Sequence, residues 1–65
     1  MKILVINSDL MVRVRILLVL ENEEDVVMTK PDANRGFALC EHWKPDKIIY
    51  DLKAAKEFAL KRNAS

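Results

Sequence analysis

The run Lys2–Ile6, with the sequence KILVI, constrains the fold more than any other part of the chain. Four of its five residues are apolar and three are β-branched, without the polar alternation of a half-exposed strand. Such a run predicts a strand that is buried on both faces, as in a parallel sheet covered by helices. Asn7, Ser8 and Asp9 follow directly. Because ligands of open parallel sheets bind beyond the carboxyl ends of the strands, these three residues are the first candidates for a site.

The rest of the chain alternates helical and strand patterns. The expected elements are a helix capped by Ser8 or Asp9 and running to about Glu21, a strand at Val26–Thr29, a helix from about Ala33 to Lys44 capped by Asp32 or Asn34, a strand at Lys47–Asp51 and a helix at Leu52–Lys61. We interpret the acidic residues 21–25 as mostly a solvated turn and residues 62–65 as a fraying tail. This order predicts an α/β fold with a three-stranded parallel sheet in the order 2-1-3, with the first and second helices on opposite faces.

Each expected helix carries an apolar face. The first helix carries two, which are Val12, Ile16, Val19 and Leu20 on one side and Leu10, Val14, Leu17 and Leu18 on the other. The inner face of the second helix is expected at Phe37, Cys40 and Trp43 or Lys44, with Gly36 allowing close packing on the sheet. The third helix places Leu52, Ala55, Phe58 and Ala59 on one side.

Length and composition exclude several classes of function. With 65 residues, the chain is expected to form one small domain, residues 1–65. Its single cysteine, Cys40, and single histidine, His42, predict neither an internal disulfide nor a metal centre, and we expect no cofactor. A net charge of +1 argues against nucleic acid or an anionic membrane as a partner, and the apolar stretch 10–20 is too short to span a bilayer. Because the N-terminus has no signal-peptide layout, a cytoplasmic location is expected.

Two segments resemble the receiver domains of response regulators. The first runs from Lys2 to Arg13, and the second joins Asp32–Cys40 to the segment Pro45-Asp46-Lys-Ile-Ile-Tyr-Asp51-Leu52. Together they cover residues 2–52, which correspond to the first half of a receiver. The resemblance implies half of a flavodoxin-like fold and places Asp51 at the phospho-acceptor position.

The chain departs from the receiver pattern at the residues that carry the chemistry. Asn7 and Ser8 stand where receivers have the aspartate pair that holds Mg²⁺, with Asp9 beside them. The later receiver strands, with their Thr or Ser and their Lys, have no counterpart here. Phosphoryl transfer to a carboxylate needs a hard cation held by oxygen ligands, and neutral side chains bind such a cation poorly. We therefore expect Asp51 to be inactive and hydrogen-bonded to Asn7, Ser8 or backbone amides.

The second apolar face of the first helix indicates an interface. In a complete receiver the final helix lies beside the first helix, and this chain has no such helix, so part of the sheet face and one side of the first helix are expected to be bare. We expect a two-fold symmetric homodimer through Leu10, Val14, Leu17 and Leu18. Pairing of two third-strand edges, exchange of the last helices, and a last helix that folds back over the stripe are the alternatives.

The sequence thus predicts a truncated, receiver-like interaction module without catalytic activity. Its possible partners are a second copy, a sensor kinase, a full receiver or a transcription factor. The alternative is a receiver that accepts a phosphoryl group at Asp51, and a remnant without a present role is a third possibility.

Overall fold

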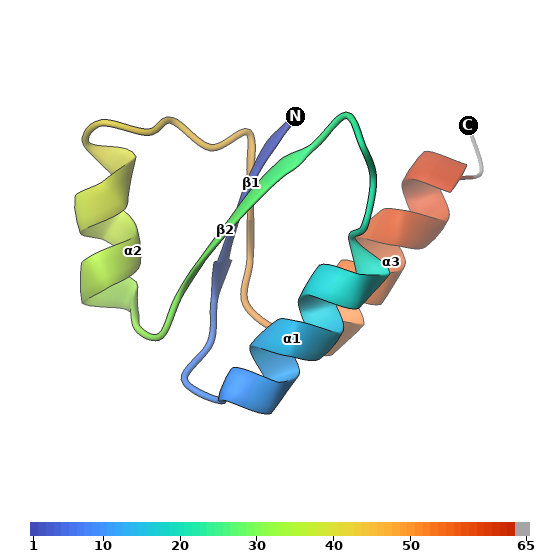
Figure 1. Cartoon of the computed structure of the whole chain (residues 1–65), viewed down its shortest axis with the longest axis horizontal. Helices are drawn as coiled ribbons and strands as arrows, with labels where there is room; N and C mark the ends of the chain where they lie inside the picture. Colours follow the sequence, from blue (N-terminus) through green and yellow to red (C-terminus); the bar gives the residue numbers. More distant parts are fainter. Residues whose placement is uncertain (64–65) are drawn as a thin grey trace.

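The structure is a computed structural model that describes residues 1–63. The elements in this part of the chain are β1 (Lys2–Ile6), α1 (Leu10–Val19), β2 (Val26–Lys30), α2 (Ala33–Cys40), β3 (Lys47–Ile49) and α3 (Leu52–Asn63). Figure 1 labels all of them except β3. None of these helices is long and apolar enough to cross a membrane.

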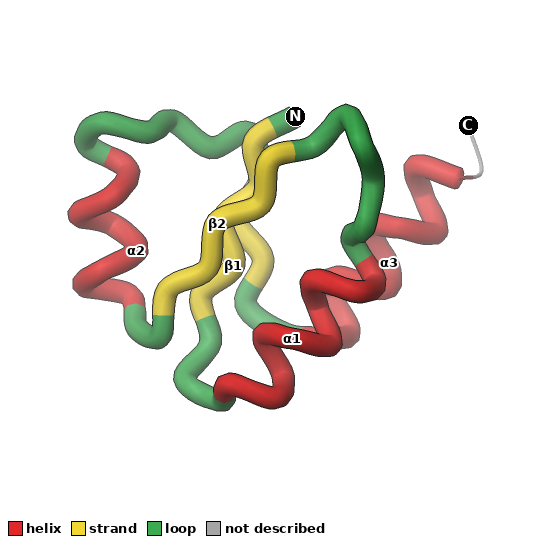
Figure 2. The backbone as a smooth tube through the Cα atoms, viewed as in Figure 1, coloured by secondary structure: helices red, strands yellow, loops and turns green. Residues whose placement is uncertain are grey.

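The strands form one parallel sheet in the order β2-β1-β3 (Figure 2). Leu4 of β1 is paired with Met28 of β2 and with Ile48 of β3. The residues Ile3–Val5 are fully buried because β1 has a strand on each side and helices above and below. The predicted α/β class, parallel sheet and strand order are therefore confirmed.

The helices lie on both faces of the sheet, with α2 on one face and α1 and α3 together on the other (Figure 1). The odd-numbered side chains of β1 face α1 and α3, and the even-numbered ones face α2. The main core cluster lies on the α1 and α3 side, and its buried members are Ile3, Val5, Ile16, Leu20, Ile49 and Ala55. Val12, Val19, Leu52 and Phe58 pack against this cluster, so the predicted inner faces of α1 and α3 are correct.

The position of α3 corrects one expectation. The sequence predicts a partly bare sheet face beside α1, but α3 packs alongside α1 on this face of the sheet. Ala55 of α3 is fully buried there. The bare region lies instead on the opposite face, where α2 contacts β1 and β2 and leaves Tyr50, just beyond β3, half exposed.

The first helix is shorter than predicted. It ends at Val19 with Leu20 as its C-cap, whose backbone N–H donates to the Ile16 carbonyl at 2.9 Å. Residues Glu21 to Asp25 cannot extend the helix favourably, because negative charge is disfavoured at a helix C-terminus. Asn22 closes a turn there by accepting a hydrogen bond from the Glu24 N–H at 2.9 Å.

The second helix packs through Gly36 and not through Phe37. Gly36 is buried against Ile6 and Leu4, whereas Phe37 is half exposed, so the predicted inner face is wrong at that residue. A Cβ atom at position 36 would lie 2.5 Å from Ile6 Cδ1, which explains why a side chain is absent at the closest contact between α2 and the sheet. This helix also ends earlier than predicted, at Cys40.

Three other boundaries differ from the predicted ones. The second strand extends to Lys30, and the third ends at Ile49 because the next residues leave the sheet to begin α3. The third helix continues to Asn63, so Arg62, predicted to lie in a fraying tail, is helical and half-buried. The predicted tail residues 64 and 65 lie outside the described residues.

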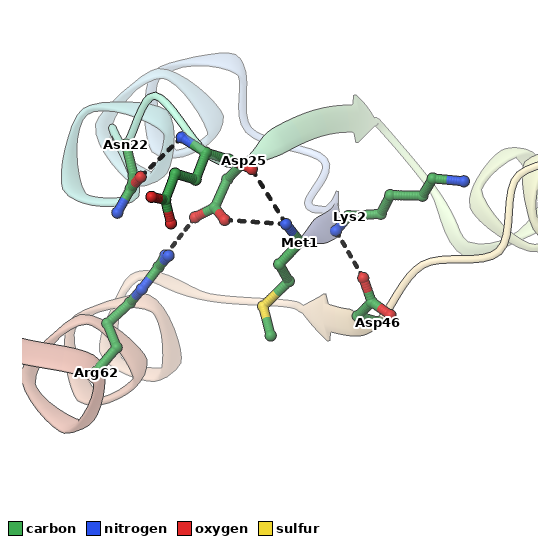
Figure 3. Close-up of polar contacts among 7 residues, drawn as sticks. Met1, Lys2, Asn22, Asp25, Asp46 and Arg62 are labelled. Carbon is green, nitrogen blue, oxygen red and sulfur yellow. Dashed lines mark hydrogen bonds and ion pairs between the residues drawn. The ribbon is translucent and has the colours of Figure 1, made fainter. Parts of the chain in front are cut away.

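A buried carboxylate joins β2 to α3 (Figure 3). The side chain of Asp25 is only 2% exposed and accepts a hydrogen bond from Arg62 of α3, so this residue is not part of a solvated turn as predicted. The Met1 amino group lies 3.3 Å from the same carboxylate. The Arg62 hydrogen bond holds the pKa of Asp25 below its usual value, although burial opposes this. The stabilisation is therefore present above the ordinary carboxyl pKa and is lost as pH falls through the lowered pKa.

Replacement of Gly36 by alanine tests the close contact between α2 and the sheet. Alanine favours the helix by about 1 kcal/mol, but overpacking against Ile6 costs roughly 1–3 kcal/mol. We expect a net loss of unfolding free energy in urea denaturation. The loss should shrink in an Ile6→Val background, which removes the nearest atom.

The exposed residue Ala38 on the same helix provides a control, because Ala38→Gly reports helix propensity alone. A Gly36→Ala variant that is more stable than the parent would contradict the close approach.

Candidate functional site

The polar residues singled out in the sequence lie where β1 and β3 leave the sheet, beside the N-termini of α1 and α3. Asn7 follows β1 and is half-buried, whereas Ser8, Asp9 and Asp51 are exposed. The structure therefore brings the ends of the two strands together, as predicted for neighbouring parallel strands.

Asn7 links several backbone segments at this edge. Its Nδ2 donates to the Tyr50 carbonyl at 2.9 Å, and its Oδ1 accepts from the Asp9 N–H at 2.9 Å. Its backbone N–H donates to the Lys30 carbonyl at 3.1 Å, and its own carbonyl accepts from Arg13 Nη1 at 2.6 Å. Asn7 thereby fixes the ends of all three strands and the start of α1, which is a structural task for a neutral side chain.

The two aspartates at this edge cap helices. Asp9 Oδ1 accepts from the N–H groups of Met11 and Val12 at the start of α1, at 2.8 and 3.3 Å. Asp51 Oδ1 accepts from the Ala54 N–H at 2.7 Å in the first turn of α3. Side chains in this position satisfy N–H groups that have no partner within the helix. Of the possibilities open from sequence for Asp51, the structure shows the bond to a backbone amide.

The edge offers few ligands for a hard cation. Within residues 1–63, no group of three His, Cys, Asp or Glu side chains lies close enough to hold a metal ion. Asp51 and Asp9 each have one carboxylate oxygen engaged with backbone amides, and Asn7 has both side-chain groups in use. Both aspartates therefore act as helix caps through one carboxylate oxygen each.

The outward side of α1 forms a second candidate site, which we call the α1 stripe. Its members are Leu10, Val14, Leu17 and Leu18, which are 63%, 41%, 38% and 67% exposed. Packing of α3 beside α1 does not bury them, so the alternative in which the last helix covers the stripe is wrong in the described chain. Met11 is also exposed on this helix. A helix that is apolar on its inner and outer sides is typical of one that has partners on both.

A third candidate is the outer side of β3, where a groove of about 190 Å³ lies between the strand and α3. Its lining residues are Lys47, Ile48, Tyr50, Asp51, Ala54, Glu57, Phe58 and Lys61. Within residues 1–63, no strand pairs with this edge of β3, in agreement with the predicted open edge.

Several residues of these sites carry roles that the sequence did not reveal. Arg13 of α1 donates a hydrogen bond to the carbonyl of Asn7, which follows β1. The ion pair between Asp25 and Arg62 joins residues that are far apart along the chain. A lone charged residue gives no sequence signal for such a partner. The i, i+4 and i, i+7 spacing of the α1 stripe, in contrast, is visible directly in the sequence.

Comparison of the chain with protein-family models, with curated proteins and with solved structures found no match.

Proposed function

We propose that the chain is a non-catalytic, receiver-like interaction module that forms a two-fold symmetric homodimer through the α1 stripe. The observation that carries this proposal is the exposure of four large aliphatic side chains on one side of a helix whose other side is already buried. Contiguous apolar patches of this kind on small soluble domains usually mark interfaces.

The energetics favour self-association over exposure to water. Full burial of an aliphatic side chain contributes roughly 1.5–3 kcal/mol. A two-fold axis buries the α1 stripe of both copies at once, so the gain is doubled and offsets an association cost of roughly 4–15 kcal/mol. A 65-residue domain also gains relative stability from such a contact, because its own core is small.

The polar edge supports a role in binding and not in catalysis. The carboxylates that could accept a phosphoryl group or hold a cation are engaged in capping α1 and α3. A sensor kinase, a full receiver or a transcription factor is proposed as a further partner. The basis is the surface that a parallel sheet with α1 at its side shares with the receivers that the sequence resembles. Such a module acts by occupying a partner's contact surface.

Replacement of Leu17 by lysine tests the proposed interface. We expect sedimentation equilibrium at micromolar concentration to give a dimer for the parent and a dissociation constant roughly one hundredfold larger for Leu17→Lys. The two-fold axis introduces the change twice, at about 1.4 kcal/mol or more each. Circular dichroism should be unchanged, because the side chain lies outside the core.

Phe37→Lys is the matched control, because Phe37 is also exposed but lies on α2, across the sheet. A parent chain that sediments as a monomer, or a Leu17→Lys variant with the parent's mass, would count against the α1 stripe.

Treatment with a small phosphodonor and Mg²⁺ separates the proposal from a phospho-accepting receiver. We expect the intact mass to remain unchanged, because Asp51 is held in a helix cap and no group of three metal-ligating side chains lies at this edge among residues 1–63. A catalytically active receiver treated in parallel checks the donor. A phosphoryl adduct on the parent that is absent from Asp51→Asn would establish the alternative function.

A further inference from the structure

We propose that the outer edge of β3 is a second self-association surface, on which the β3 strand of another copy adds in antiparallel orientation to give a continuous six-stranded sheet. This inference is independent of the α1 stripe, because it rests on a different element and on a different side of the sheet. Its starting point is that no strand within residues 1–63 covers this edge.

The hydrogen bonds of β1 show which backbone groups of β3 point outward. The Met1 carbonyl accepts from Val26 and the Asn7 N–H donates to Lys30, so the odd-numbered residues of β1 are bonded to β2. Because backbone groups alternate in direction along a strand, the even-numbered residues of β1 face β3, as the Lys2 carbonyl does in accepting from Asp46.

This alternation fixes the open groups of β3. Leu4 lies opposite Ile48 in the register, and both of its backbone groups point at β3. In a parallel ladder its hydrogen-bond partners are the residues on either side of Ile48, which are Lys47 and Ile49. The N–H and C=O of Ile48 therefore point away from the sheet. An antiparallel strand centred on Ile48 uses both groups, since two facing residues exchange a pair of hydrogen bonds in such a ladder.

The charged side chains at the two ends of β3 favour this orientation of a second copy. Lys47 begins the strand, Asp51 lies two residues beyond its end, and both side chains line the groove beside β3. Antiparallel pairing centred on Ile48 places Lys47 opposite the other copy's Ile49, with that copy's Asp51 and Lys47 as its diagonal neighbours. The two Lys47–Asp51 diagonals are attractive and outnumber the single repulsive Lys47–Lys47 diagonal. Parallel pairing places like charges side by side.

The groove beside β3 is also lined by charged side chains from both ends of the strand. Lys47, whose Nζ lies 6.0 Å from the centre of the Phe58 ring, lines it at the start of β3 together with Lys61 and Glu57 of α3. Asp51 lines it beyond the end of β3. On the α2 side of the sheet, the half-exposed Tyr50 follows Ile48, and a paired copy would cover both residues with its own apolar side chains.

Amide hydrogen exchange followed by NMR tests the proposal in a Leu17→Lys background, which removes the α1 contact. We expect the Ile48 amide to exchange rapidly at low micromolar concentration and to become protected at millimolar concentration. The Ile49 amide, which bonds to β1, is the internal control and should be protected at both concentrations. Rapid exchange of the Ile48 amide at every protein concentration would overturn the proposal. Binding of an unrelated extended peptide to this edge would not rescue it, because the proposed occupant is a second copy of the chain.

A double-mutant cycle on the charges tests the orientation. Lys47→Glu should weaken association roughly tenfold, because two attractive pairs become repulsive. In an Asp51→Asn background, which keeps the helix cap, the same change should have little effect. An equal loss in both backgrounds would rule out the antiparallel register.

The results also separate this inference from the α1 dimer. If the Leu17→Lys variant is monomeric and its Ile48 amide exchanges rapidly, the α1 stripe is the only association surface. If Lys47→Glu weakens association of the parent and Leu17→Lys does not, the β3 edge is the only association surface. If both surfaces operate, two isologous contacts per chain give assemblies larger than a dimer.

Discussion

The packing of α3 against α1, on one face of the sheet, is the interaction that decides which surfaces the chain leaves open. Ala55 is fully buried in the cluster that contains Ile16 and Ile49, and the Asp25–Arg62 ion pair ties the far end of α3 to the start of β2. With α3 in this position, the shared core is closed on the α1 side. On the opposite face, α2 packs mainly against β1 and β2, and no strand among the described residues pairs with the outer edge of β3.

The polar residues at the carboxyl edge of the sheet serve the fold. Asn7 connects strand ends, and Asp9 and Asp51 supply the first turns of α1 and α3 with hydrogen-bond acceptors. A neutral residue at position 7 suits this task, since it donates and accepts at once, which a carboxylate cannot do. The chain therefore has the strand arrangement predicted from its alternating strand and helix patterns, with a polar edge that stabilises structure. The surfaces proposed for binding are the apolar α1 stripe and the β3 edge.

The sequence was sufficient to predict the parts of the structure that depend on local pattern. The apolar runs and helical spacing predicted the parallel sheet, its strand order, the inner faces of α1 and α3 and the exposed stripe on α1. Features that depend on contacts between distant residues were missed. Phe37 was assigned to the inner face of α2 because apolar residues usually lie there, whereas close packing at Gly36 turns Phe37 outward. The burial of Asp25 depends on Arg62, thirty-seven positions later, and no local pattern reveals such a pair.

The face of the sheet on which α3 packs can be measured directly by nuclear Overhauser effects from the Ala55 methyl group in a methyl-labelled sample. The account predicts contacts to the methyl groups of Ile16 and Ile49, which belong to the core on the α1 side. Contacts from Ala55 to Leu4 or Ile48, whose side chains point to the α2 side, would contradict it. In that case α3 would cover the region that is proposed to receive a second copy, and one flank of α1 would be bare.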